Sequence, residues 1–216
     1  MSNGPEFLLH LMIETNLIIQ LFRNLQNRIH MTKKSLAYAF SMFFLCINAG
    51  AQEKTEVDEK IDVVSLVRKY SETVSCGSHF EEEKSNKKFI NNIHTIEKDL
   101  ELGIRTYFML WDGDIGCNGG SGTHSYIVSE VGRYSDSRPL LVRNDNAFGD
   151  EVAKKINFRF IKKIQQISPT KFFITSSEHL DKDANNFPSQ SYRYQVDLIK
   201  YQWKVTSREF LGKNAY

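Results

Sequence analysis

The stretch RTYFMLWD, Arg105 to Asp112, alternates large apolar side chains in a way that predicts the central β-strand of the fold. Every second residue from Tyr107 to Trp111 would point to one side of such a strand, while Phe108 and Leu110 would point to the other. Because both sides are apolar, we expect the strand to be covered on both faces. The other segments of the chain are therefore expected to supply the layers that cover this strand.

Two helices are predicted before this strand. From Val57 to Val74 apolar residues recur at intervals of three and four, and Gly77 follows where a helix favours a left-handed cap. A second helix is predicted between Ser85, a suitable N-cap, and Gly103, with four apolar residues at helical spacing: Phe89, Ile93, Ile96 and Leu100.

Strands are predicted after the central stretch. Four short segments have strand character: Tyr126–Val131, Leu140–Arg143, Ile156–Phe160 and Lys171–Thr175. From Tyr192 to Val205 the alternation is regular but slips by one residue between Leu198 and Ile199, which requires a β-bulge or a tight reversal near Asp197–Lys200. Helices followed by strands predict an α+β fold in residues 52–216, with one or two N-terminal helices packed on a mostly antiparallel sheet.

An export signal is predicted upstream of this domain. The segment from Met31 has two lysines, an apolar run over residues 36–47 and small residues before Gln52, as secretory signal peptides have. Its apolar run is shorter than the roughly 20 residues that a bilayer requires. Leu45 before Cys46 does not fit a lipoprotein signal. We therefore expect cleavage after Ala51, no lipid anchor, and a periplasmic location, with secretion as the alternative.

Residues 1–30 precede that signal and are expected to be an upstream extension, with translation beginning at Met31. The run Phe7–Phe22 contains His10, Glu14, Asn16 and Gln20, which are too polar for a membrane span. Residues 1–51 carry four of the 28 Lys and Arg and two of the 26 Asp and Glu, so the remaining chain has 24 of each and no net charge. Nucleic acid is therefore not an expected partner.

Two cysteines remain after cleavage, Cys76 and Cys117. In an oxidising compartment an even pair predicts one disulfide. A bridge across this spacing would stabilise the fold by roughly 4 kcal/mol, because it restricts the unfolded chain. That contribution is a large part of a typical margin of about 5 to 15 kcal/mol.

The glycine-rich stretch WDGDIGCNGGSGTHS, Trp111 to Ser125, surrounds the second cysteine. It is not a P-loop, because Thr123 and His124 follow Gly122 where Lys and Ser or Thr are needed. Nor is it a nucleophile elbow around Ser121, because Thr123 replaces the second glycine. We expect the loop to anchor the disulfide, and its bare backbone could also contact a partner.

No metal ion or cofactor is predicted. Asp112 and Asp114 could face a calcium ion, but no bidentate carboxylate follows at the expected distance. Asp181 begins an EF-hand-like run that lacks the required glycine and glutamate. The histidines of residues 52–216 do not have zinc-ligand spacing; they are His79, His94, His124 and His179.

Two local motifs resemble those of papain-family cysteine proteases. The segments Cys76-Gly77-Ser78-His79 and Gly116–Gly120 are similar to the family's CGSC and GCNGG motifs. The resemblance implies that Cys76 pairs with Cys117, as the outer cysteines do in that family. His79 stands where the family has its nucleophilic cysteine, so the attacking thiolate is absent and an active papain-like enzyme is not expected.

A second resemblance covers Trp111–Thr123, with the pattern W-x-G-D-x-G-C-x-G-G-S-G-T, together with Cys76-x-x-His79-Phe80. It is similar to small exported bacterial proteins without an assigned activity, some of them grouped with periplasmic inhibitors or immunity proteins of secreted toxins. The resemblance implies an exported location more than a mechanism.

These observations favour an exported, non-catalytic protein that binds another protein, such as a toxin or an envelope enzyme. The residues expected to bind are Trp111, Asp112, Asp114, Gly119, Gly120, Ser121, Tyr201 and Trp203. Tyr192 and Tyr194 are further aromatic candidates. At least half of the four aromatic residues Tyr192, Tyr194, Tyr201 and Trp203 are expected to fill the core instead. The alternative is an exported hydrolase that uses Cys76 or Ser121 with His79 or His124.

Overall fold

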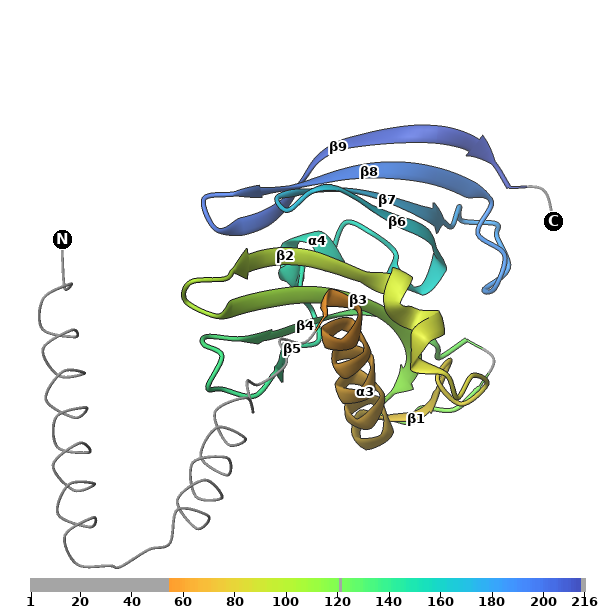
Figure 1. Ribbon diagram of the computed structural model, residues 1–216. Helices are drawn as coiled ribbons and strands as arrows, with labels where there is room; N and C mark the ends of the chain where they lie inside the picture. Colours follow the sequence, from red (N-terminus) through yellow and green to blue (C-terminus); the bar gives the residue numbers. More distant parts are fainter. Residues whose placement is uncertain (1–54, 121, 215–216) are drawn as a thin grey trace, which may run out of the picture. The chain divides into compact units, whose positions relative to one another are not determined.

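A computed structural model describes residues 55–120 and 122–214 (Figure 1). The predicted extension, the predicted signal peptide and Ser121 lie outside the described residues. The described chain consists of two antiparallel sheets and a few helices. Sheet A contains β1 (Ser75–Ser78), β2 (Ile93–Asp99), β3 (Ile104–Ile115), β4 (Ser125–Arg133) and β5 (Leu141–Asn144). Sheet B contains β6 (Ile161–Ser168), β7 (Lys171–Glu178), β8 (Gln190–Ile199) and β9 (Gln202–Lys213).

Strand β3 is the centre of sheet A. It pairs with β4 from Arg105 opposite Arg133 to Gly113 opposite Ser125. Its other edge is shared, because β2 pairs with the first half of β3 and β1 with its last residues. Sheet B is simpler: β6, β7, β8 and β9 pair in sequence order.

The two faces of β3 are covered by different layers, as the alternation predicts. Tyr107, Met109 and Trp111 are buried in one cluster, which is completed by helix α3 (Glu56–Val74) through Val63, Val64 and Val67. Phe108 belongs to the other cluster, with residues of sheet B. The prediction that this strand is covered on both faces is confirmed.

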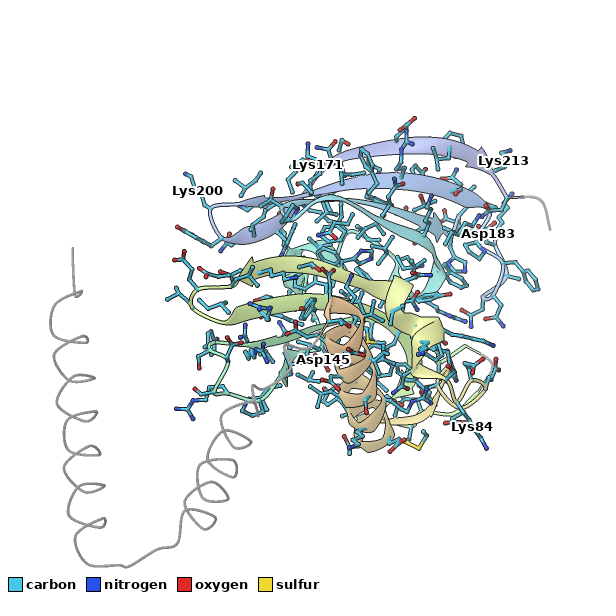
Figure 2. All side chains as sticks on the ribbon, viewed as in Figure 1. Lys84, Asp145, Lys171, Asp183, Lys200 and Lys213 are labelled. Atoms are coloured by element: carbon cyan, nitrogen blue, oxygen red, sulfur yellow. A yellow bond between two sulfur atoms is a disulfide. The ribbon has the colours of Figure 1, made fainter. Side chains whose placement is uncertain are left out.

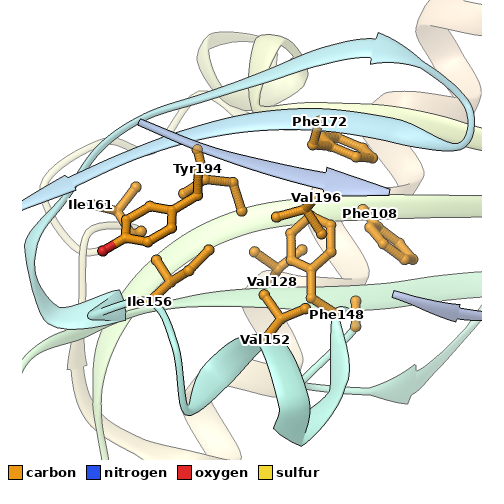
Figure 3. Close-up of a cluster of buried hydrophobic side chains, with 11 residues drawn as sticks. Phe108, Val128, Phe148, Val152, Ile156, Ile161, Phe172, Tyr194 and Val196 are labelled. Atoms are coloured by element: carbon orange, nitrogen blue, oxygen red, sulfur yellow. The ribbon is translucent and has the colours of Figure 1, made fainter. Parts of the chain in front are cut away.

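The cluster between the sheets forms the larger part of the core. Figure 3 shows Phe108 and Val128 from sheet A facing Phe172, Tyr194 and Val196 from sheet B. The short helix α4 (Gly149–Ala153) lies at the border of this layer and contributes Val152. Burial of this apolar surface is what holds the two sheets together.

Helix α3 begins where the sequence predicts. The side chain of Thr55 accepts a hydrogen bond from the Asp58 backbone N–H and so caps the first turn. Glu59 is buried and pairs with Arg105 at 3.5 Å and Arg133 at 3.3 Å, both on sheet A. The helix therefore contacts the sheet through both apolar and ionic side chains.

The predicted α+β class is wrong, because the chain is mostly antiparallel β-sheet in two layers with few helices. The second helix is absent: η1, a 3-10 helix at Asn86–Asn92, leads into strand β2. A helix would bury its regularly spaced apolar residues on one common face. Here Ile93 contacts the α3 layer, Ile96 contacts the layer between the sheets, and Leu100 is exposed.

The other strand predictions were mostly confirmed. The segments at 126–131, 140–143 and 171–175 correspond to β4, β5 and β7. The segment Ile156–Phe160 was wrong, because Ile156 is buried after α4 and Phe158–Phe160 form a 3-10 turn, η2. The reversal predicted near Asp197–Lys200 is confirmed as the turn between β8 and β9.

Candidate functional site

The turn between β8 and β9 has an unusual backbone. Ile199 and Gln202 form the last pair of the ladder, so Lys200 and Tyr201 make a two-residue turn. Their φ angles are 49° and 65°, both in the left-handed region. Such turns favour Asn and Gly, because a side chain at positive φ is strained. Figure 2 shows Lys200 at this end of the hairpin.

Tyr201 is the most exposed large side chain at this turn, with 98% of its surface accessible. Burial of its ring therefore contributes little to the fold. Trp203, two residues later, packs partly against the core between the sheets and contacts the rings of Phe108, Phe148 and Phe172. The two aromatic residues that the sequence predicts at this end thus differ: Tyr201 is free to contact a partner, and Trp203 is half-buried.

A hollow of about 340 Å³ lies beside the turn. Its walls come from the hairpin and from the segment between β5 and α4, brought together by the contact of α4 with β9. The lining residues are Asn144, Asn146, Ala147, Phe148, Gly149, Asp150, Glu151, Tyr201, Gln202 and Trp203.

The hollow has an acidic wall. Asp150 accepts a hydrogen bond from the Asn146 side-chain amide at 2.9 Å. Among residues 55–120 and 122–214, no basic side chain forms an ion pair with Asp150. Glu151 pairs with Lys155 at 3.0 Å, and the hydrogen bond from Lys155 holds the pKa of Glu151 below its usual value. Of the two carboxylates, Asp150 is the one without a counter-ion.

The second candidate region lies at the C-terminal end of β3. Cys76 and Cys117 form the predicted disulfide, with their Cα atoms 4.9 Å apart. Strand β1 begins directly after α3 and pairs with the end of β3, which brings the two cysteines together. The bridge thus connects the end of the first helix to the glycine-rich loop.

Asp114 holds this loop from inside. It is buried, and its carboxylate accepts hydrogen bonds from the backbone N–H groups of Asn118 and Gly119 at 3.3 and 3.0 Å. Gly119 and Gly120 have φ angles of 66° and 112°, and a side chain added at either would meet open space. These glycines are therefore required by backbone conformation. Both lie on the surface.

Two histidines share the carboxylate of Asp112. Nδ1 of His79 lies 2.6 Å from one carboxylate oxygen, and Nδ1 of His124 lies 3.5 Å from the other. Burial alone would raise the pKa of Asp112, but the hydrogen bonds and charges of His79 and His124 outweigh burial and lower it. The three residues form an Asp–His cluster beside the disulfide.

The chemistry open to this cluster is limited by its surroundings. The His79 ring packs against Phe80 and Phe89, and its Nε2 is buried without a hydrogen-bond partner among the described residues. Cys76, the nearest sequence candidate for a nucleophile, is in the disulfide. No group of three or more His, Cys, Asp or Glu side chains within 55–120 and 122–214 is arranged to hold a metal ion.

The predicted binding residues fall into two places. Trp111 is fully buried on the α3 side of sheet A, where its Nε1 donates a hydrogen bond to Ser129 at 2.8 Å. Asp112, Asp114, Gly119 and Gly120 lie near it at the disulfide end. Tyr201 and Trp203 lie at the hollow, and Trp203 packs on the opposite face of sheet A. Tyr194 is buried in the core and Tyr192 is half-buried.

The two other histidines within residues 55–120 and 122–214 have structural surroundings. His94 packs edge-on against Phe172, and burial lowers its pKa to about 4, with the charge of Lys60 adding to the effect. Nε2 of His179 lies 3.0 Å from the Asn185 carbonyl.

Sequence analysis missed the acidic wall of the hollow. Phe148 and Asp150 come from a segment that has no strand or helix pattern of its own, more than 50 residues from Tyr201. Two asparagines, Asn144 and Asn146, are typical of turns and gave no sign of a site. The contact of α4 with β9 and the ring contact of Phe148 with Trp203 bring these segments together.

Comparison of the chain with protein-family models, curated proteins and solved structures gave no match. Within the described residues, no helix has both the length and the apolar character needed to cross a membrane. The candidate site is therefore defined by its geometry.

Proposed function

We propose that this chain is an exported, non-catalytic protein that binds another protein, of the inhibitor or immunity type, and that the β8–β9 turn is its binding tip. The observation that carries the proposal is the pair Lys200 and Tyr201. Both residues have a left-handed backbone, and Tyr201 is almost fully exposed.

The strain at this turn supports a role in binding. A non-glycine residue in the left-handed region costs roughly 1 to 2 kcal/mol, and strained backbone of this kind clusters at functional sites. An exposed tyrosine has few rotatable bonds and presents a large amphipathic surface, so it loses little entropy when it binds. A rigid hairpin that carries such a ring is suited to insertion into a partner's cleft.

Export is supported by the disulfide, because such bonds persist in oxidising compartments and are rare in the cytosol. The signal segment expected at residues 31–51 agrees with this location. The partner proposed is accordingly a protein of the envelope or a secreted toxin.

The competing proposal is an exported hydrolase. Its cysteine form requires a free thiol at Cys76, which the disulfide removes. Its serine form would use Ser121 with His124 or His79 and is tested by labelling the purified protein with a fluorophosphonate. Covalent labelling of Ser121 would favour the hydrolase, whereas an unlabelled protein favours the binding function.

The binding tip is tested by site-specific photo-crosslinking. A benzoylphenylalanine replaces Tyr201 in the full chain, which is expressed in cells of the source organism and irradiated. The control carries the same group at Leu180, which is also exposed but lies in the loop between β7 and β8, at the end of β8 opposite to the tip. We expect a discrete adduct from position 201 that the control does not give. Identical adducts from both positions, or none from 201, would overturn the proposed tip.

A further inference from the structure

We infer that the hollow beside the binding tip receives an arginine side chain of the partner. This inference rests on the proposed function, because the partner delivers the arginine when Tyr201 docks. It adds the chemistry of recognition, which the turn alone does not specify.

The aromatic lining of the hollow suits a flat cation. Tyr201 and Trp203 line it from the hairpin; Phe148, from the segment before α4, borders it but is almost fully buried. A guanidinium stacks on aromatic faces through cation–π attraction, and tryptophan is the best acceptor of this kind. In the described part of the chain, arginines already stack this way on Tyr134 and Tyr192, at 4.0 and 3.8 Å from the ring centres. No basic side chain of that part lies over Trp203.

The charges of the hollow also select a cation. Asp150 faces it without an ion pair to any described basic residue, and Glu151 lies beside it. Four lysines lie close to the two carboxylates in sequence or in space. Lys154 is the C-cap of α4, Lys155 pairs with Glu151, Lys204 lowers the pKa of the same carboxylate, and Lys200 is in the turn. None of the four lines the hollow. Asp150 is therefore left to pair with a cation from outside the chain.

The acidic wall is held in place before any ligand arrives. Asn146 donates its side-chain amide to Asp150, and the Asn146 backbone N–H donates to the Asn144 side chain at 2.8 Å. Asn144 in turn donates its amide to the Asn146 carbonyl at 3.2 Å. A carboxylate fixed in this way loses less entropy on binding than a mobile one does.

The test uses a small probe, so that it does not depend on finding the partner. The ¹⁵N-labelled full chain, freed of its signal segment by the cell, is titrated with Nα-acetyl-arginine amide and followed by NMR. The two tryptophans of the chain provide an internal comparison. We expect the Trp203 indole signal to shift with saturation, while the Trp111 signal, buried with its N–H bonded to Ser129, stays in place.

Matched ligands and variants separate charge from shape. Nα-acetyl-citrulline amide has nearly the same shape without the charge and should bind at least about tenfold more weakly, a factor that corresponds to one lost charge contact. Asp150→Asn keeps the acceptor oxygen for Asn146 and should weaken the arginine probe by a similar factor. Glu101→Gln removes an exposed charge that does not line the hollow and should leave the affinity unchanged.

Equal affinity for the arginine and citrulline probes, or an arginine affinity that Asp150→Asn does not lower, would overturn the arginine site. So would the absence of any Trp203 shift. These results would leave the proposed binding tip intact if position 201 still crosslinks to a partner. Conversely, binding of the probe without any crosslink from position 201 would support the arginine site and contradict the tip.

Discussion

Lys200 and Tyr201 occupy consecutive left-handed backbone positions, and they form the turn that connects the antiparallel strands β8 and β9. A chain selected for stability alone would have Asn and Gly here. The turn therefore exchanges stability for an exposed aromatic ring at its tip. The stability of the chain and the binding of a partner by Tyr201 can be measured separately.

Relaxing the turn should stabilise the protein. The double variant Lys200→Asn/Tyr201→Gly supplies the residues that this turn type favours, and we expect its free energy of unfolding to rise by about 2 kcal/mol, which is the strain of two left-handed residues less the folding entropy of the new glycine. Urea denaturation followed by circular dichroism measures the change. Substitution of Lys171→Asn, on an ordinary strand position, should give no gain. A double variant less stable than the original chain would show that the left-handed pair is not strained.

Removal of the disulfide should lower stability strongly. The Cys76→Ala/Cys117→Ala variant loses the restriction on a 41-residue separation, and we expect roughly 4 kcal/mol less free energy of unfolding. Comparison of urea midpoints for the oxidised chain, the reduced chain and this variant measures the effect. If the oxidised and reduced chains unfolded at the same urea concentration, the bridge would have no stabilising role.

The buried ion pairs of α3 should be far more important than its exposed ones. Glu59→Gln leaves Arg105 and Arg133 without their shared carboxylate, and breaking a buried pair of this kind costs about 3 kcal/mol or more. Glu56→Gln removes exposed pairs with Lys60 and Lys98 and should cost less than about 1 kcal/mol. Thermal or urea unfolding of both variants at pH 7 gives the comparison, and equal losses would contradict it.

His94 should make the protein acid-sensitive. Its folded-state pKa is about 4, against an ordinary value of 6.5, so the unfolded chain binds the proton more tightly. Stability due to neutral His94 is complete above pH 6.5 and is lost as the pH falls toward 4, by about 3 kcal/mol in total. The variant His94→Gln cannot gain this proton. We expect the difference in stability between the original chain and the variant to shift by that amount between pH 7 and pH 4; a difference independent of pH would refute the assignment.

The sequence predicted the central layer of the fold well, because RTYFMLWD carries a complete pattern within one strand. It also predicted the disulfide, whose two partners are the cysteines that remain once the expected signal segment is set aside. The error at residues 85–102 has a physical cause: Ile93 and Ile96 keep helical spacing, yet they are buried on opposite faces of a bulged strand, with the bulge between Thr95 and Glu97. The spacing of apolar residues alone does not distinguish a helix from a bulged strand that is buried on both faces.

The candidate site was predicted only in part. Tyr201 and Trp203 were identified because the last strands alternate regularly between apolar and polar residues, which marks them as aromatic residues on one side of a strand. Asp150 and Phe148 were not, because a hollow formed by two distant segments depends on tertiary contacts that no local pattern records. Trp111 shows the opposite error. Its place beside a glycine-rich loop suggested a contact surface, but the structure places it in the core.

The most direct test of the central claim is partner capture by three chains immobilised at equal amounts: the original, Lys200→Asn, and Lys200→Asn/Tyr201→Gly. The captured partner, identified beforehand by its crosslink to position 201, is quantified together with the free energy of unfolding of each chain. We predict that Lys200→Asn keeps the partner, and that the double variant loses it at least tenfold while being the most stable of the three. Undiminished capture by that more stable double variant would contradict a binding function of the β8–β9 turn.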